Sequence, residues 1–454
     1  MSQRNPYELD PQAILEPPRR LLEQLRYCGP GFILSACIVG SGELIATTTL
    51  GAKAGFATLW VILLSCLVKV AMQLQFARHA IQHGETALTA INRLPGLRFG
   101  PANWAIWFWA LMFPVRVLQV GGIVGGLGLL MNLIVPSVPV AAWCLAAAVA
   151  AALLVSAERY QLIERASLAM TVLFTTLTFT SVVALQWTDY AFTASDVLGG
   201  LQGQLPADAV FFVIAAFGLT GVGGDEILYY TYWLLEKGYA ARVGPYRPDD
   251  PDWQRRARGW TRIMTLDAIV SMVSYTAVTC AFYILGAAVL HARGELPEGT
   301  AMVETLARMY TESLGPWAED VFLAGAFVVL FSTTFSALAS WTRIYSDTLG
   351  QLGFLEFEDP QQRLRSIRIM AWGFPLLWAV VFLFVKQPMY MIMLGGLATA
   401  AVLLLVVYAA ICFRYGRTAP ELKPSWAYDA AFWASAVAIA AFAASGIAKA
   451  IGSG

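Results

Sequence analysis

Two short polar stretches interrupt apolar segments at matching places in the sequence. VGSGELI at 39–45 and VGGDEIL at 222–228 align without a gap, and Glu43 then coincides with Glu226. Glycine weakens a helix, and unwound backbone inside a membrane must be satisfied by protein, water or an ion. Carboxylate and carbonyl oxygens are ligands for hard cations such as Mg²⁺, Mn²⁺, Ca²⁺ or Na⁺. The two stretches therefore predict a central binding site.

The residues expected at this site combine acids, unwound backbone and two polar side chains from a third segment. We expect a substrate to contact Gly40, Ser41, Glu43, Gly223, Gly224, Asp225, Glu226, Arg116 and Gln119. Of these, Glu43, Asp225 and Glu226 are the candidate metal ligands, because an acid inside a membrane is a functional hypothesis by default. Helix capping is the structural alternative: Asp225 as an N-cap with Glu226 in the first turn, and Glu43 in a similar place.

Two basic residues lie inside apolar segments. Arg116 stays charged, so it needs a carboxylate, carbonyls or water around it. One interpretation is a salt bridge to one of the three acids, and the other is that Arg116 holds an anionic group of a substrate or replaces a coupling cation. We expect Lys69 to extend its side chain toward the inner membrane surface.

Hydroxyl groups gather in the segment FSTTFSALASWTR at 331–343. Ser332, Thr333, Thr334 and Ser336 would complete a sodium site with backbone carbonyls of the first broken helix. The alternative is that these hydroxyls bond to the backbone of their own helix, which is common in membrane helices. The six cysteines have no CxxC spacing and the three histidines lie near helix ends, so neither group predicts a metal centre.

The composition is that of a polytopic membrane protein with an all-α fold. Of the 454 residues, 58% are hydrophobic and only 13% are charged, whereas soluble domains carry about 25% charged residues. The net charge is zero, which gives no reason to expect a nucleic-acid partner. A spanning helix needs about 20 apolar residues. Eleven segments qualify, at about 30–53, 56–78, 104–133, 138–156, 166–187, 207–235, 264–290, 319–342, 368–385, 388–412 and 428–448.

Lysine and arginine set the expected orientation, because they accumulate in cytoplasmic loops. With the N-terminus inside, 23 of the 30 fall in cytoplasmic segments and five in outer ones. We therefore expect the N-terminus in the cytoplasm, the C-terminus outside, and a place in the cell (inner) membrane. Five spans in each half then have opposite orientations, as in an inverted-repeat transporter. The expected parts are a cytoplasmic segment 1–29, repeats 30–190 and 207–412, and an additional helix 428–448.

The segment 29–78 resembles the Nramp family of divalent-metal transporters. It reads GPGFILSACIVGSGELIATTTLGAKAGFATLWVILLSCLVKVAMQLQFAR, and the family shares the GPG opening, a break motif, GAK-x-G and LW in the same order. The resemblance implies a LeuT-type fold with broken helices 1 and 6. It also implies alternating access and proton-coupled uptake of manganese or ferrous iron.

The sequence departs from the family at the positions that the resemblance would make functional. The family's DPGN motif falls on Gly40, Ser41, Gly42 and Glu43, so the metal-binding Asp becomes a glycine and the Asn becomes a glutamate. GVGGDE at 221–226 stands in place of the family's Met-Pro-His motif, and its acid pair in helix 3 falls on Arg116 and Gln119. These changes disfavour a soft transition metal and a family-like proton path.

Two functions follow as hypotheses. The first is a secondary transporter of a hard divalent cation, Mg²⁺ or Mn²⁺, with H⁺ or Na⁺ as the coupling ion and no bound cofactor. The second is a sodium-coupled transporter of a small organic solute that uses Arg116 and the hydroxyls of 331–343. No catalytic motif indicates an enzyme. The expected surroundings are the lipid bilayer and a small ion or molecule, with a monomer among the assemblies left open.

Overall fold

The computed structural model describes residues 6–28, 40, 42–156 and 160–452, and almost all of its secondary structure is helical. The helices are α1 Leu21–Leu25, α3 Thr48–Ala54, α4 Leu59–His83, α5 Ala87–Asn92, α6 Trp104–Leu111, α7 Phe113–Ile134, α8 Val140–Ser156, α9 Tyr160–Ala184, α10 Ala194–Gly199, α11 Val210–Leu219, α12 Gly224–Glu236, α13 Tyr239–Val243, α14 Pro251–Leu285, α15 His291–Arg293, α16 Met302–Leu314, α17 Ala318–Gln351, α18 Pro360–Val385, α19 Pro388–Cys412 and α20 Trp426–Gly452. A π-helical segment, Gly42–Thr47, precedes α3, and β1 Arg98–Phe99 pairs antiparallel with β2 Ala102–Asn103.

The helices of the described chain confirm the prediction of an all-α membrane protein. In the described part of the chain, eight helical stretches are long and apolar enough to cross a membrane. Two shorter apolar helical stretches, Val140–Ser156 and Val172–Trp187, accompany them. One of the eight, Gly42–His83, covers parts of the first two expected spans, and residues 30–39 and 41 of the first span lie outside the described residues. The count of eleven spans stays a prediction.

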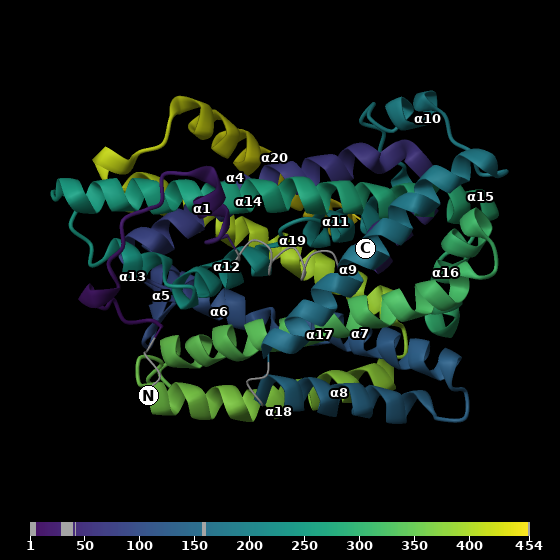
Figure 1. The fold of residues 1–454 in the computed structure, drawn as a ribbon, viewed down its shortest axis with the longest axis horizontal. Coiled ribbons are helices and arrows are strands. Elements are labelled where there is room, and N and C mark those ends of the chain that lie inside the picture. Colours follow the sequence, from purple (N-terminus) through teal and green to yellow (C-terminus); the bar gives the residue numbers. More distant parts are fainter. Residues whose placement is uncertain (1–5, 29–39, 41, 157–159, 453–454) are drawn as a thin grey trace.

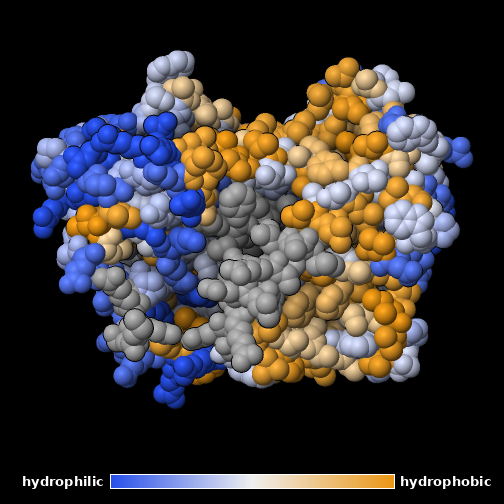
Figure 2. Space-filling view, in the orientation of Figure 1, coloured by the Kyte–Doolittle hydropathy of each residue, from blue (hydrophilic) through white to orange (hydrophobic). Residues whose placement is uncertain are grey.

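Most of the long helices run in a similar direction and form a bundle (Figure 1). Hydrophilic residues gather at one end of the bundle, on the left in Figure 2, and hydrophobic residues cover much of the rest of this face. The hydrophilic end holds α1, α13 and the start of α14 (Figure 1). This distribution is the one expected where helices leave a membrane for water.

The N-terminal segment 6–28 lies across this hydrophilic end and is fixed by polar contacts. The Tyr7 hydroxyl donates to Glu236 Oε1 at 2.8 Å, and the Trp260 indole donates to the Leu15 carbonyl at 2.9 Å. Arg255 forms an ion pair with Glu16 at 2.9 Å. These contacts join the segment to α12 and α14.

Two polar segments between the expected spans are partly helical. In 236–262, α14 begins at Pro251, where Asp250 caps the helix by accepting from the Asp252 amide. The connection 291–317 contains the amphipathic helix α16. Charged residues are compatible with a helix in both segments because one face of the helix packs against neighbours.

A pair of glycines lets α11 and α19 touch backbone to backbone. A Cβ at Gly218 would overlap the carbonyl of Gly396, and a Cβ at Gly396 would overlap the carbonyl of Ala215. Small residues allow this close approach in membrane proteins, where van der Waals contact drives helix association. The crossing fixes the end of α11 at the place where the helical path is interrupted.

We predict that Gly218→Ala lowers the free energy of unfolding by about 1–3 kcal/mol, because the added methyl group forces the two backbones apart. Thermal unfolding in detergent measures the change. Gly373→Ala in α18 is the control, since nothing lies within 4 Å of the position of its Cβ. Equal unfolding midpoints for the two variants would contradict the close crossing.

Candidate functional site: a cavity beside an interrupted helix

The chain leaves helical geometry between α11 and α12. Thr220 is extended (φ −70°, ψ 140°), Gly221 has the left-handed φ of +66°, and Gly223 is extended (φ −75°, ψ 173°). A Cβ at Gly221 would also lie 3.0 Å from the Cα of Cys66. Glycine is therefore needed at 221 both for its φ and for its packing.

Lys69 of α4 satisfies the carbonyl groups at the end of α11. Its Nζ donates to the carbonyls of Phe217 at 2.7 Å and Thr220 at 2.5 Å, and the Ser65 hydroxyl donates to the same two oxygens at 3.0 Å. Lys69 is fully buried, so the expectation that it reaches the membrane surface is wrong. The negative end of the α11 dipole and the unpaired carbonyls attract the ammonium group more strongly than a distant surface does.

The acids Asp225 and Glu226 lie in the first turn of α12. Gly223 is the N-cap of this helix and no side chain caps it, so the interpretation of Asp225 as a cap is wrong. The carboxylate of Glu226 folds back over Gly223, where a Cβ would overlap Glu226 Oε2. Gly224 packs against α19, since a Cβ there would lie 3.2 Å from the Thr399 carbonyl. The helix N-terminus favours both negative charges.

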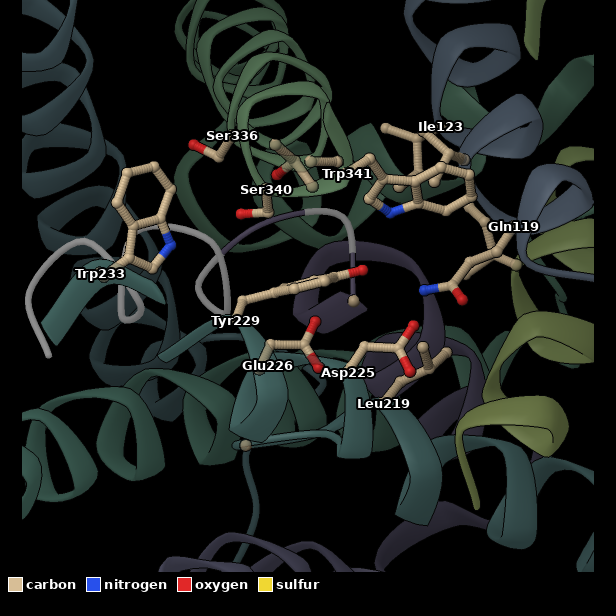
Figure 3. Close-up of a pocket in the computed structure, with 16 residues that line it drawn as sticks. Gln119, Ile123, Leu219, Asp225, Glu226, Tyr229, Trp233, Ser336, Ser340 and Trp341 are labelled. Atoms are coloured by element: carbon tan, nitrogen blue, oxygen red, sulfur yellow. The ribbon is translucent and has the colours of Figure 1, made fainter. Parts of the chain in front are cut away.

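A cavity opens beside this turn, between α7, α12 and α17 (Figure 3). Asp225 and Glu226 point into it from α12, Gln119 reaches it from α7, and Ser336 and Ser340 approach from α17. The other lining residues are Gly42, Val120, Ile123, Leu219, Gly221, Tyr229, Trp233, Thr333, Ala337, Trp341 and Ile392. The polar lining consists of oxygen and nitrogen groups, and no His, Cys or Met of the described chain contributes to it.

Arg116 lies behind Asp225 and is not part of the cavity lining. Its Nη2 lies 3.0 Å from Asp225 Oδ1, which matches the predicted salt bridge to one of the three acids. The guanidinium also stacks 3.6 Å from the centroid of the Trp109 ring, and Nη1 lies 3.5 Å from the Tyr345 hydroxyl. Among the described residues, Nε, Nη2 and Asp225 Oδ1 have no partner with hydrogen-bond geometry, so the ion pair is held by charge alone.

Glu43 is fully buried and lies apart from the cavity lining. Its carboxylate accepts from the Gly40 amide at 3.4 Å and from the Thr279 hydroxyl of α14 at 3.3 Å. The contact to Gly40 resembles the capping role considered for Glu43. Ser41 lies outside the described residues. No group of three or more His, Cys, Asp and Glu side chains in the described chain is close enough to hold a metal.

The hydroxyls proposed for sodium bond within their own helix. Ser332 and Thr333 donate to the Val329 carbonyl at 3.1 and 2.8 Å, and Thr334 donates to the Leu330 carbonyl at 2.9 Å. This is the alternative weighed for the segment. Ser336 and Thr333 also line the cavity.

The sequence interpretation missed the aromatic walls. Tyr229 and Trp233 follow Glu226 at helical spacing, Ser340 lies one turn after Ser336, and Trp341 lies two turns after Thr333. Repeated steps of three or four residues from each polar position along its helix would have found them. The buried hydroxyl of Tyr229 has no hydrogen-bond partner among the described residues, so it is free to bind a ligand.

A sequence model of the natural resistance-associated macrophage protein-like family, Nramp, matches residues 31–449. The chain belongs to the Nramp family. It is therefore an integral membrane transporter, and the resemblance found in residues 29–78 is confirmed. An uncharacterized protein of Pasteurella multocida is 23% identical over 335 residues, which make up 71% of this chain and 70% of that protein.

Solved structures share the fold. The manganese transporter of Eremococcus coleocola, in complex with an aromatic bis-isothiourea compound, is 14% identical, with a TM-score of 0.62 over 95% of this chain and 88% of that chain. A sodium-coupled sialic acid symporter is 13% identical, with a TM-score of 0.51 over 90% of this chain and 89% of that chain. Both likenesses concern the LeuT-like fold alone.

We predict that Arg116→Gln lowers the free energy of unfolding by about 3–5 kcal/mol, because Asp225 is left as an uncompensated buried charge. The double variant Arg116→Gln/Asp225→Asn recovers most of the loss. Thermal unfolding in detergent compares the variants. Arg255→Gln is the control, because its ion pair with Glu16 is half-exposed and such pairs contribute at most about 1 kcal/mol. A double variant no more stable than the single one would contradict the pairing.

Proposed function

We propose that the chain is a secondary transporter that carries a hard divalent cation, Mg²⁺ or Mn²⁺, through the cavity by alternating access. The observation that carries this proposal is the pair Asp225 and Glu226, whose carboxylates face a cavity lined by hydroxyl and amide oxygens without sulfur or imidazole. Hard cations select such donors. Membership of the Nramp family and the fold of a manganese transporter support the same substrate class.

A transported cation would have to compete with Arg116 for the Asp225 carboxylate. An arriving divalent ion would draw the Asp225 carboxylate away from the guanidinium, which then keeps its contacts with the Trp109 ring and Tyr345. Glu226 is not engaged by Arg116 and would meet the ion first. Arg116 thus balances the charge of Asp225 when no cation is bound. It also disfavours ions whose charge is too low to displace it from Asp225.

The same proposal includes the arrangement of the membrane spans and their orientation. Eleven spans would form the inverted repeats 30–190 and 207–412 plus the helix 428–448, with interruptions at Gly40 and at 220–223. The N-terminus would lie in the cytoplasm and the C-terminus outside the cell membrane, as the distribution of Lys and Arg favours. The coupling ion would be H⁺ or Na⁺, and the working unit a monomer.

Isothermal titration of the purified protein tests the divalent-cation proposal. We expect saturable binding of Mg²⁺ or Mn²⁺ that Glu226→Gln and Asp225→Asn weaken at least about 100-fold, since loss of a supporting group alone costs 10–100-fold. Asp320→Asn, an exposed acid at the start of α17, is the control and keeps full affinity. Glu43→Gln tests the third acid. Absence of any saturable divalent binding would overturn the proposal.

A second candidate function is the sodium-coupled transport of a small organic ammonium or amino-acid-like solute. Tyr229, Trp233 and Trp341 give the cavity aromatic walls, and aromatic faces attract organic cations. The charged side chains at the two interrupted segments favour the same class, since the three acids Glu43, Asp225 and Glu226 outnumber the two bases beside them, Arg116 and Lys69, by one. A single positive charge balances this set, whereas a divalent ion leaves an excess.

Thermal unfolding with choline, as a quaternary ammonium, and glycine, as a zwitterion, tests the second candidate. We expect one of the two to raise the unfolding midpoint in NaCl but not in KCl. Tyr229→Phe should reduce the effect, because it removes a buried hydroxyl that has no hydrogen-bond partner among the described residues while keeping the ring. Saturable Mg²⁺ or Mn²⁺ binding together with no response to either organic compound would exclude it.

A further inference from the structure

A basic groove lies at the hydrophilic end of the molecule, away from the central cavity. It is formed by the end of α4, the first half of α14 and the chain that leads into α20, which lie along one edge of the bundle (Figure 1). The residues that define it are Arg78, Arg258, Arg262, Leu266, Ile269 and Leu422. The remaining lining residues are uncharged, so three arginines face the groove and no carboxylate of the described residues lines it.

None of the three arginines is neutralised by an ion pair within the described residues. Arg78 is 7% exposed and stacks 4.6 Å from the Tyr428 ring, with one hydrogen bond to Gln75. Arg258 donates to Gln254 and to the Glu421 carbonyl, neither of which removes its charge. Arg262 is exposed. The three guanidinium groups leave a local positive charge in the groove, which favours the binding of an anion.

The groove changes from charged to apolar along one face of α14. Arg258, Arg262, Leu266 and Ile269 are spaced three or four residues apart, so they form one stripe about 16 Å long. Ile269 is 43% exposed although it lies in an apolar stretch, which is the pattern of a side chain that faces lipid. The charged end and the apolar end match the headgroup and the upper acyl chain of a phospholipid.

We propose that this groove binds an anionic phospholipid, with the phosphate of its headgroup on Arg258, Arg262 and Arg78 and an acyl chain along Leu266 and Ile269. Arginine binds phosphate oxygens through pairs of N–H groups. Basic pockets between membrane helices on the cytoplasmic side are suited to anionic headgroups. A free phosphate would use the arginines alone and leave the apolar end uncovered.

Native mass spectrometry of the delipidated full-length protein tests the proposal, with phosphatidylglycerol, phosphatidylcholine and inorganic phosphate as probes. We expect phosphatidylglycerol to bind more tightly than phosphatidylcholine. The double variant Arg258→Gln/Arg262→Gln should weaken phosphatidylglycerol about 30-fold, as expected for two arginines near a membrane surface. The control is Arg365→Gln/Arg368→Gln, which removes the same charge from an exposed part of α18 and should leave binding unchanged.

A single variant provides a second test in case the double variant does not fold. Arg262→Gln removes a side chain for which the described chain provides no hydrogen bond or ion pair, and it should weaken phosphatidylglycerol about fivefold. Equal binding of the two lipids, an equal loss in the α18 control, or competition by inorganic phosphate at the affinity of the lipid would each overturn the proposal. These outcomes do not depend on which solute the central cavity carries.

Discussion

The contact between the Lys69 ammonium and the last carbonyls of α11 is the interaction on which the central region depends. A helix that stops inside a membrane leaves carbonyl oxygens that lipid cannot satisfy, and each would cost several kcal/mol. Lys69 and Ser65 bind the carbonyls of Phe217 and Thr220. Because those groups are satisfied, the chain can turn at Gly221 and start α12 with its two acids facing the cavity.

The sequence predicted the place of the interruption better than it predicted its surroundings. Glycines 221, 223 and 224 and the acids that follow them marked the break, because their chemistry does not suit an ordinary membrane helix. The partner of Arg116 could be narrowed to three acids, and the fold selected Asp225. The role of Lys69 could not be deduced, since nothing in its own helix shows that the end of α11 packs against it.

The departures from the family pattern now have structural consequences. Where the family places an acid pair in helix 3, this chain has Arg116 against Asp225 and Gln119 on the cavity wall. A permanent positive charge in place of acids changes the electrostatic balance of the whole region. Aromatic side chains at 229, 233 and 341 further reduce the space that water could use to hydrate an ion. The selectivity of this cavity for its solute must therefore depend on other interactions than those of the family motif.

Helix α14 has a mechanical consequence. Its 35 residues extend about 52 Å, whereas the hydrocarbon core of a bilayer is about 30 Å thick. The part beyond the membrane carries the N-terminal segment through Trp260 and Arg255, while the part within contacts Glu43 through Thr279. Because α14 is one continuous helix, a tilt near Glu43 would also displace its first turns and the N-terminal segment 6–28 that they hold.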